Sequence, residues 1–248
     1  MLPTLSLGSI AIPTYPLFLL IAFWVGLWLA AWQAGRLGLD GDHVYNAGLL
    51  GLVAGIIGAR VWFVLSHWEN YAPNPLQALS LSRAALSVGE GLIIAGVVVL
   101  IYLQRSRVPL GLFGDAVAPG LALAGAIAQA GAFIAGVELG RETSMPWAVV
   151  VGGTARHPVQ LYEVLTNLVI FGLLLALKDR PWPGFRFWVF VLFYATGRLF
   201  LEIFKAQPLR VGDGYLAGQI LALSAVLVAL AVMGYNFSHT FSQGSERP

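Results

Sequence analysis

Cysteine is absent from all 248 residues of the chain. Disulfide bonds, thiolate metal ligands and a cysteine nucleophile are therefore excluded. Charge is also scarce, because Asp, Glu, Lys and Arg make up 10% of the residues, whereas soluble domains carry about 25%. The basic residues form no run, so we expect no nucleic-acid partner. We also expect no cofactor. The four histidines lack the short spacing of a metal site, which predicts that no metal is bound: His43, His67, His157 and His239.

Long apolar runs, by contrast, recur along the whole chain, and 58% of the residues are hydrophobic. Each run is close to the ~20 residues that a helix needs to cross a bilayer, and none shows the alternation of a barrel strand. The sequence therefore predicts an all-α, polytopic membrane protein with a single transmembrane domain over residues 1–248, of which 237–248 form a mobile cytoplasmic tail. Seven spans are predicted: Tyr15–Ala34, Tyr45–Ser66, Ala85–Leu103, Leu112–Ala135, Gln160–Leu177, Phe187–Phe204 and Tyr215–Tyr235.

The orientation follows from Lys and Arg, which favour the cytoplasmic loops. In this arrangement of spans, seven basic residues fall on the side of the C-terminus and five on the other. The bias predicts that the N-terminus lies outside and the C-terminus in the cytoplasm. The loops 67–84 and 136–159 would then lie at the outer face.

A few charged residues fall inside or at the edge of the predicted spans, where a charge costs on the order of 3 kcal/mol. Such groups must face one another or a wet cavity. Tyr194, Arg198 and Glu202 are four residues apart and share one helix face. The stripe is either a structural ion pair between helices or a site where the Arg198 guanidinium binds a lipid phosphate. The charged residues concerned are Arg60, Glu90, Asp115, Glu163, Arg198 and Glu202.

The segment 156–163, RHPVQLYE, is mostly polar and leads directly into the fifth predicted span. Its imidazole, on His157, could serve as a general acid or base near neutral pH. Alternatively, His157 caps the first turn of the following helix, for which Pro158 is a suitable neighbour. Both interpretations remain open at this point.

Three motifs resemble those of the prolipoprotein diacylglyceryl transferases. The segment 156–163 is similar to the family's Arg-His-Pro-Ser-Gln-Leu-Tyr-Glu, and 194–204 (YATGRLFLEIF) is similar to its Tyr-Gly-x-x-Arg-Phe-x-x-Glu-Phe pattern. The segment 218–223 (GQILAL) resembles the family's Gly-Gln-x-Leu-Ser. Weaker similarities lie at Tyr15, at 58–60 and in the loop 140–148. The resemblance covers nearly the full length and the same layout of spans.

The resemblance implies a reaction in which the diacylglyceryl group of phosphatidylglycerol moves to the thiol of a lipobox cysteine. It also implies the bacterial cytoplasmic (inner) membrane as the location. Expected partners are phosphatidylglycerol or another phospholipid, a preprolipoprotein signal peptide and other membrane subunits. The candidate catalytic residues are Glu90, His157, Glu163, Tyr194 and Glu202. The candidate substrate-binding residues are Tyr15, Arg60, Gln129, Gln160, Tyr162 and Arg198.

The chain departs from the family at several polar positions. The family's functional histidine corresponds to Gly89, its essential arginine to Gln129, and two asparagines to Ala132 and Ala135. Gln129 can donate a hydrogen bond to a phosphate, but it cannot neutralise one. One interpretation is an active transferase in which Glu90 or Glu163 serves as base. The alternative is a catalytically inactive paralogue that serves as a structural subunit of a membrane complex.

Overall fold

The computed structural model describes residues 1–8, 10–76, 87–178, 180–206, 210–211 and 215–244, and most of these residues are helical. The long helices are α1 (Thr14–Arg36), α2 (Asp42–Ser66), α4 (Val88–Arg105), α5 (Leu110–Ala135), α6 (Val159–Ala176), α7 (Phe185–Leu201) and α8 (Ala217–Gly244). The short ones are α3 (Trp68–Tyr71) and the 3-10 helix η3 (Glu202–Phe204). The prediction of an all-α polytopic membrane protein is confirmed.

Six helices of the described residues are long and apolar enough to cross a membrane. They coincide with six of the predicted spans, and the remaining one, Ala85–Leu103, falls on α4, although Ala85 and Leu86 lie outside the described residues. The last helix is longer than predicted. Because α8 continues to Gly244, residues 237–244 of the expected tail are helical, and 245–248 lie outside the described residues.

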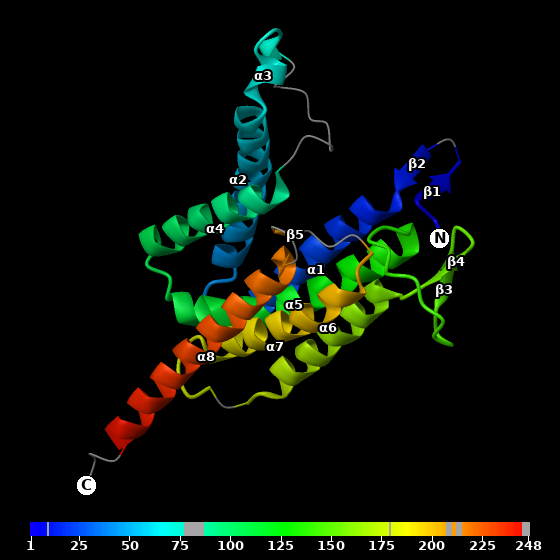
Figure 1. Cartoon of the computed structure of the whole chain (residues 1–248). Helices are drawn as coiled ribbons and strands as arrows, with labels where there is room; N and C mark the ends of the chain where they lie inside the picture. Colours follow the sequence, from blue (N-terminus) through cyan, green and yellow to red (C-terminus); the bar gives the residue numbers. More distant parts are fainter. Residues whose placement is uncertain (9, 77–86, 179, 207–209, 212–214, 245–248) are drawn as a thin grey trace.

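The helix α5 holds the bundle together. It packs against α1, α6 and α7, while α8 packs on α7 and α4 on α2 (Figure 1). Figure 1 shows the α2–α4 pair set apart from the other long helices, and α1 is its main neighbour among them. Small residues allow the closest approach: a Cβ on Gly120 would lie 2.5 Å from the Gly26 carbonyl oxygen. Close backbone packing of this kind is typical of helices in membranes.

The helices α5 and α6 are antiparallel, and their register matters for the site. Gln160, at the start of α6, donates a hydrogen bond of 2.5 Å to the carbonyl of Val137, just beyond the end of α5. Further along α6, the Asn167 amide lies against Gly125 of α5. Gln129 and Glu163 lie one helical turn from Gly125 and Asn167, toward the end of the bundle where Gln160 meets Val137. They therefore lie at the same level along the two helices.

Three two-stranded antiparallel hairpins, which the sequence did not predict, lie within the loops of the described residues. Their strands are β1 (Thr4–Leu7) with β2 (Ile10–Pro13), β3 (Val149–Val151) with β4 (Thr154–Arg156), and β5 (Arg210–Val211) with β6 (Tyr215–Leu216). The first two lie at one end of the bundle, and the C-terminus lies at the other (Figure 1). The amide of Leu2 donates to the Ile134 carbonyl over 2.7 Å, which fixes the first hairpin to the end of α5.

Large apolar side chains cover the outside of the long helices. Trp28, Ile57, Leu92 and Leu227 are each more than half exposed. Soluble monomers rarely expose apolar patches of such extent. The surface is therefore suited to lipid, and the buried positions hold mostly small residues.

Candidate functional site

The Arg198 side chain joins two buried carboxylates. Its Nη1 lies 2.5 Å from Glu163 Oε1, and its Nη2 lies 3.4 Å from Glu202 Oε2. The carboxylate side chains are only 4% and 6% exposed, whereas that of Arg198 is 29% exposed. The structure thus brings together, from α6, α7 and η3, three residues that the sequence proposed for one site.

Two glycines make this meeting possible. Gly197 of α7 faces α6, since a Cβ there would lie 2.7 Å from Thr166 Cγ2. Gly218, in the first turn of α8, faces Glu202, because its Cβ would lie 2.6 Å from the carboxyl carbon. The neighbouring Gln219 donates to the Leu199 carbonyl over 3.3 Å and so ties α8 to α7. The Gly-Gln pair therefore positions the carboxylate of Glu202 against the start of α8.

Two further charged residues, Lys205 and Glu138, belong to the cluster and were not predicted from the sequence. Lys205 Nζ lies 3.6 Å from Glu163 Oε1 and 3.5 Å from Glu138 Oε2. Both residues stand in loops just outside the predicted spans. Glu138 also has a positive φ of 58°, a conformation that is uncommon for non-glycine residues and often marks functional sites. Lys205 could have been noticed because it lies seven residues after Arg198, close to its helix face.

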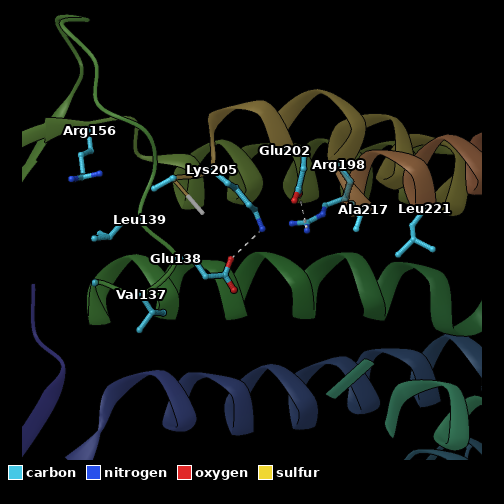
Figure 2. A pocket seen from close by; sticks show the side chains of 12 residues that line it. Val137, Glu138, Leu139, Arg156, Arg198, Glu202, Lys205, Ala217 and Leu221 are labelled. Carbon is cyan, nitrogen blue, oxygen red and sulfur yellow. Dashed lines mark hydrogen bonds and ion pairs between the residues drawn. The ribbon is translucent and has the colours of Figure 1, made fainter. Parts of the chain in front are cut away.

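A cavity of about 830 Å³ opens beside this cluster. Figure 2 shows Arg198, Glu202 and Lys205 on one side, with Glu138 facing Lys205 and the apolar Leu221 further along α8. The cavity is thus lined by both charged and apolar side chains, which suits an amphiphile. Its lining comprises Gly136, Val137, Glu138, Leu139, Arg156, Arg198, Glu202, Lys205, Ala206, Ala217, Gly218 and Leu221.

Two tyrosines lie close to the charges. Tyr15, at the start of α1, is near enough to Glu138 and Glu163 to interact with them electrostatically. Tyr194, one turn before Arg198, interacts in the same way with Arg198 and Glu163. Their hydroxyl groups can donate hydrogen bonds to anionic oxygens. Tyr15 therefore brings the start of α1 close to the cluster, although it does not line the cavity.

Apart from Glu163, the polar residues of segment 156–163 contact the preceding loop, 136–158, and connect it to the bundle. The Tyr162 hydroxyl accepts a hydrogen bond of 2.7 Å from Trp147 Nε1 and lies 3.2 Å from His157 Nδ1. Arg156 Nη2 pairs with Glu142 Oε1 at 3.1 Å. Within the described residues, the His157 ring makes its hydrogen bond to the Tyr162 side chain, so it contacts the first turn of α6 without capping the backbone. Its ring edge also meets Phe204 of η3, with centroids 4.9 Å apart.

Three further predicted site residues lie elsewhere. Arg60 is buried in α2, with its guanidinium carbon 5.4 Å from the centre of the Tyr71 ring. Glu90 stands in the first turn of α4, so both belong to the α2–α4 pair, and neither lines the cavity. Gln129 lies on α5 at the level of Glu163, and its Oε1 is buried without a hydrogen-bond partner among the described protein atoms. Within the described ranges, no group of three or more His, Asp or Glu could hold a metal ion.

The contact between Gly218 and Glu202 gives a testable prediction. In Gly218→Ala, the new methyl group displaces the Glu202 carboxylate from Arg198, and Tm in mild detergent falls by about 2–4 °C, which corresponds to about 1 kcal/mol. Gly234→Ala, in the same helix but with no atom within 4 Å of the added Cβ, leaves Tm unchanged or slightly raised. Equal effects of the two substitutions would contradict the proposed contact.

The fold and the site define a class of protein: a multi-pass membrane protein with an ion-pair cluster in an amphiphilic cavity at one end of its bundle. The family model for prolipoprotein diacylglyceryl transferase matches residues 3–235. The chain belongs to this family, and it is a multi-pass protein of the bacterial inner membrane.

Similar proteins carry the corresponding name. The phosphatidylglycerol–prolipoprotein diacylglyceryl transferase of Clostridioides difficile (strain 630) is 29% identical over 237 residues, which cover 95% of this chain and 93% of the relative. The transferase of the same name from Corynebacterium diphtheriae is 31% identical over 251 residues, 91% of this chain and 88% of the relative. That from Trichormus variabilis is 28% identical over 247 residues, with 93% and 87% coverage.

Proposed function

We propose that this chain transfers the diacylglyceryl group of phosphatidylglycerol to the thiol of a lipobox cysteine in a preprolipoprotein. The observation that carries the proposal is the amphiphilic cavity beside Arg198. The names of the relatives support the same donor and acceptor. We further propose that this end of the bundle faces outward, with the N-terminus outside and the C-terminus in the cytoplasm.

In this proposal, the cations of the cavity bind the lipid phosphate. The guanidinium of Arg198 offers a planar fork that matches two phosphate oxygens. Its contact with Glu202, at 3.4 Å, is longer than its contact with Glu163, at 2.5 Å, so the phosphate displaces Glu202 first. Lys205 and Arg156 also line the cavity and add positive charge that the neutral Gln129 does not supply. The acyl chains leave along the apolar side near Leu221.

Glu163 is the base in this mechanism, because its carboxylate contacts Arg198 and Lys205, two cations that line the cavity. Glu90 stands on α4, in the helix pair set apart from this cluster. The Glu163 carboxylate takes the proton of the acceptor thiol, and the sulfur attacks the glyceryl carbon that carries the phosphate. One S–C bond forms, one C–O bond breaks, and glycerol-1-phosphate leaves. Arg198 and Lys205 stabilise the charge that develops on the departing phosphate oxygen. Tyr15 and Tyr194 donate hydrogen bonds to the headgroup, while Gln160, Tyr162 and His157 hold the outer loop in place.

A second candidate function follows from the pairing of Arg198, whose guanidinium already contacts two carboxylates. Gln129, at the same level, is neutral and does not compete with Arg198 for these carboxylates. In this alternative, the chain is a catalytically inactive paralogue that serves as a structural subunit of a membrane complex.

A direct assay separates the two candidates. The purified chain, mixed with phosphatidylglycerol vesicles and a lipobox peptide, is expected to release glycerol-1-phosphate and to increase the peptide mass by one diacylglyceryl group. A peptide with serine in place of the cysteine is the control and gives no product. Absence of release from a folded chain, together with stoichiometric partners in native detergent extracts, would support the inactive subunit instead.

A further inference from the structure

Asn167 is an unusual residue for the middle of a membrane helix. It is only 4% exposed. Its Nδ2 donates a hydrogen bond of 2.8 Å to the Glu163 carbonyl. Its Oδ1 is buried and has no partner among the described protein atoms. A buried acceptor is costly without a donor, so the amide oxygen calls for a further hydrogen-bonding group.

The turn of α6 that carries Asn167 packs closely against both neighbouring helices. Glycines of both neighbouring helices flank this turn of α6. A Cβ on Gly125 of α5 would lie 2.7 Å from Asn167 Oδ1, and a Cβ on Gly197 of α7 would lie 2.7 Å from Thr166 Cγ2. Any larger residue at these two positions would push α6 away from its neighbours.

A small crevice lies at this junction of α6 and α7. Its volume of about 10 Å³ is close to the smallest that holds one water molecule. A buried water also needs two to four polar partners, and the walls offer Asn167, Glu163, Tyr194 and Arg198. The full lining is Glu163, Thr166, Asn167, Tyr194, Gly197, Arg198 and Leu201.

We propose that this crevice binds one water molecule, which donates a hydrogen bond to Asn167 Oδ1 and connects the Glu163 carboxyl group with the Tyr194 hydroxyl. Its role rests on the proposed function. After Glu163 has taken the thiol proton, it passes that proton to the water, while the water gives one of its own to the Tyr194 oxygen and the Tyr194 hydroxyl gives its proton to the departing phosphate. The three transfers occur together, so the thiol proton ends on the phosphate, tyrosine and water keep their protonation, and Glu163 returns to its charged form. Asn167 is a positioning residue in this relay.

The test uses Asn167→Thr, because threonine keeps a hydrogen bond to the carbonyl four residues earlier, as Thr166 does to Tyr162 at 2.9 Å. It removes the amide oxygen. We expect a structure that resolves solvent to show the water in the wild type and not in the variant. Tm in detergent falls by about 2–4 °C, since the water and its hydrogen bonds are lost. If no water is bound, removing an unpaired acceptor leaves Tm unchanged or raised, which would overturn the proposal.

The relay has its own readout. We expect the transfer rate to fall about 10-fold or more, and its dependence on the deuterium fraction of the solvent to change from curved to linear, because fewer protons move together. Asn236→Thr is the matched control: Asn236 Nδ2 makes the same 2.8 Å bond to the Val232 carbonyl, but on α8. It leaves the deuterium dependence as in the wild type, and an effect equal to that of Asn167→Thr would overturn the relay.

The two proposals fail in different ways. A wild-type chain that releases no glycerol-1-phosphate contradicts the transferase and, with it, the role of the water. The crystallographic or cryo-EM density and the Tm comparison still decide whether the water is bound. Release at an unchanged rate from Asn167→Thr, by contrast, overturns the relay alone.

Discussion

Arg198→Ala is expected to stop the release of glycerol-1-phosphate and to destabilise the protein by about 3 kcal/mol. The substitution leaves the carboxylates of Glu163 and Glu202, 4% and 6% exposed, without their shared guanidinium. Lys205 remains 3.6 Å from Glu163 and limits the loss, so the value lies at the lower end of the range for a broken buried pair. Thermal unfolding in detergent and the peptide assay measure the two effects.

A double substitution separates charge from packing. In Arg198→Ala with Glu163→Gln, the neutral amide no longer needs a cation, so the double variant is expected to be more stable than Arg198→Ala alone. Transfer stays absent, because the phosphate fork and the base are both missing. Arg198→Lys keeps the charge but cannot contact both carboxylates at once, and an intermediate stability follows. Strictly additive losses in the double variant would contradict a direct interaction between Arg198 and Glu163.

Asp115→Ala is the second substitution with a large expected effect, about 3 kcal/mol of lost stability. Asp115 of α5 is fully buried and accepts hydrogen bonds from the backbone amides of Gly184, at 2.9 Å, and Phe187, at 3.2 Å. It thus caps the start of α7 from a different helix, and its removal leaves two backbone donors unpaired, one buried and one partly buried. Thermal unfolding in detergent measures the loss.

The control for Asp115 is Asp40→Ala. Asp40 Oδ1 accepts a hydrogen bond of 2.9 Å from the amide of Asp42 at the start of α2, but this contact is exposed to solvent. Its loss is expected to cost only about 0.5–1 kcal/mol. Because Asp115 lies at the end of α5 opposite to Glu138, the rate of transfer per folded molecule stays near that of the wild type in both variants. A selective loss of rate in Asp115→Ala would contradict a purely structural role.

Much of the architecture could be predicted from the sequence because lipid imposes a simple rule on composition. Runs of about 20 apolar residues mark helices, and six such helices are found where they were expected. The spacing of Tyr194, Arg198 and Glu202 also predicted their common helix face. Their meeting with Glu163 was anticipated only on the ground that buried charges seek partners.

What could not be predicted depends on loops and on helix register. Lys205 and Glu138 enter the cluster from connecting segments, whose path follows from tertiary contacts and not from periodicity. Nothing in the sequence distinguishes Asn167, because its buried amide oxygen depends on the packing of Gly125 of α5 against it. Nothing in the spacing of Arg60 and Glu90 indicates that they belong to a helix pair set apart from the Arg198 cluster.

The ion pair between Glu163 and Arg198 has a consequence for biosynthesis. The two residues are 35 positions apart in the chain, so at 5–20 residues per second the ribosome makes Arg198 about 2–7 s after Glu163. During that interval α6 carries a carboxylate that has no guanidinium to meet it. We therefore expect α6 to wait at the translocon until α7 has been made, and the two helices to enter the bilayer as one hairpin.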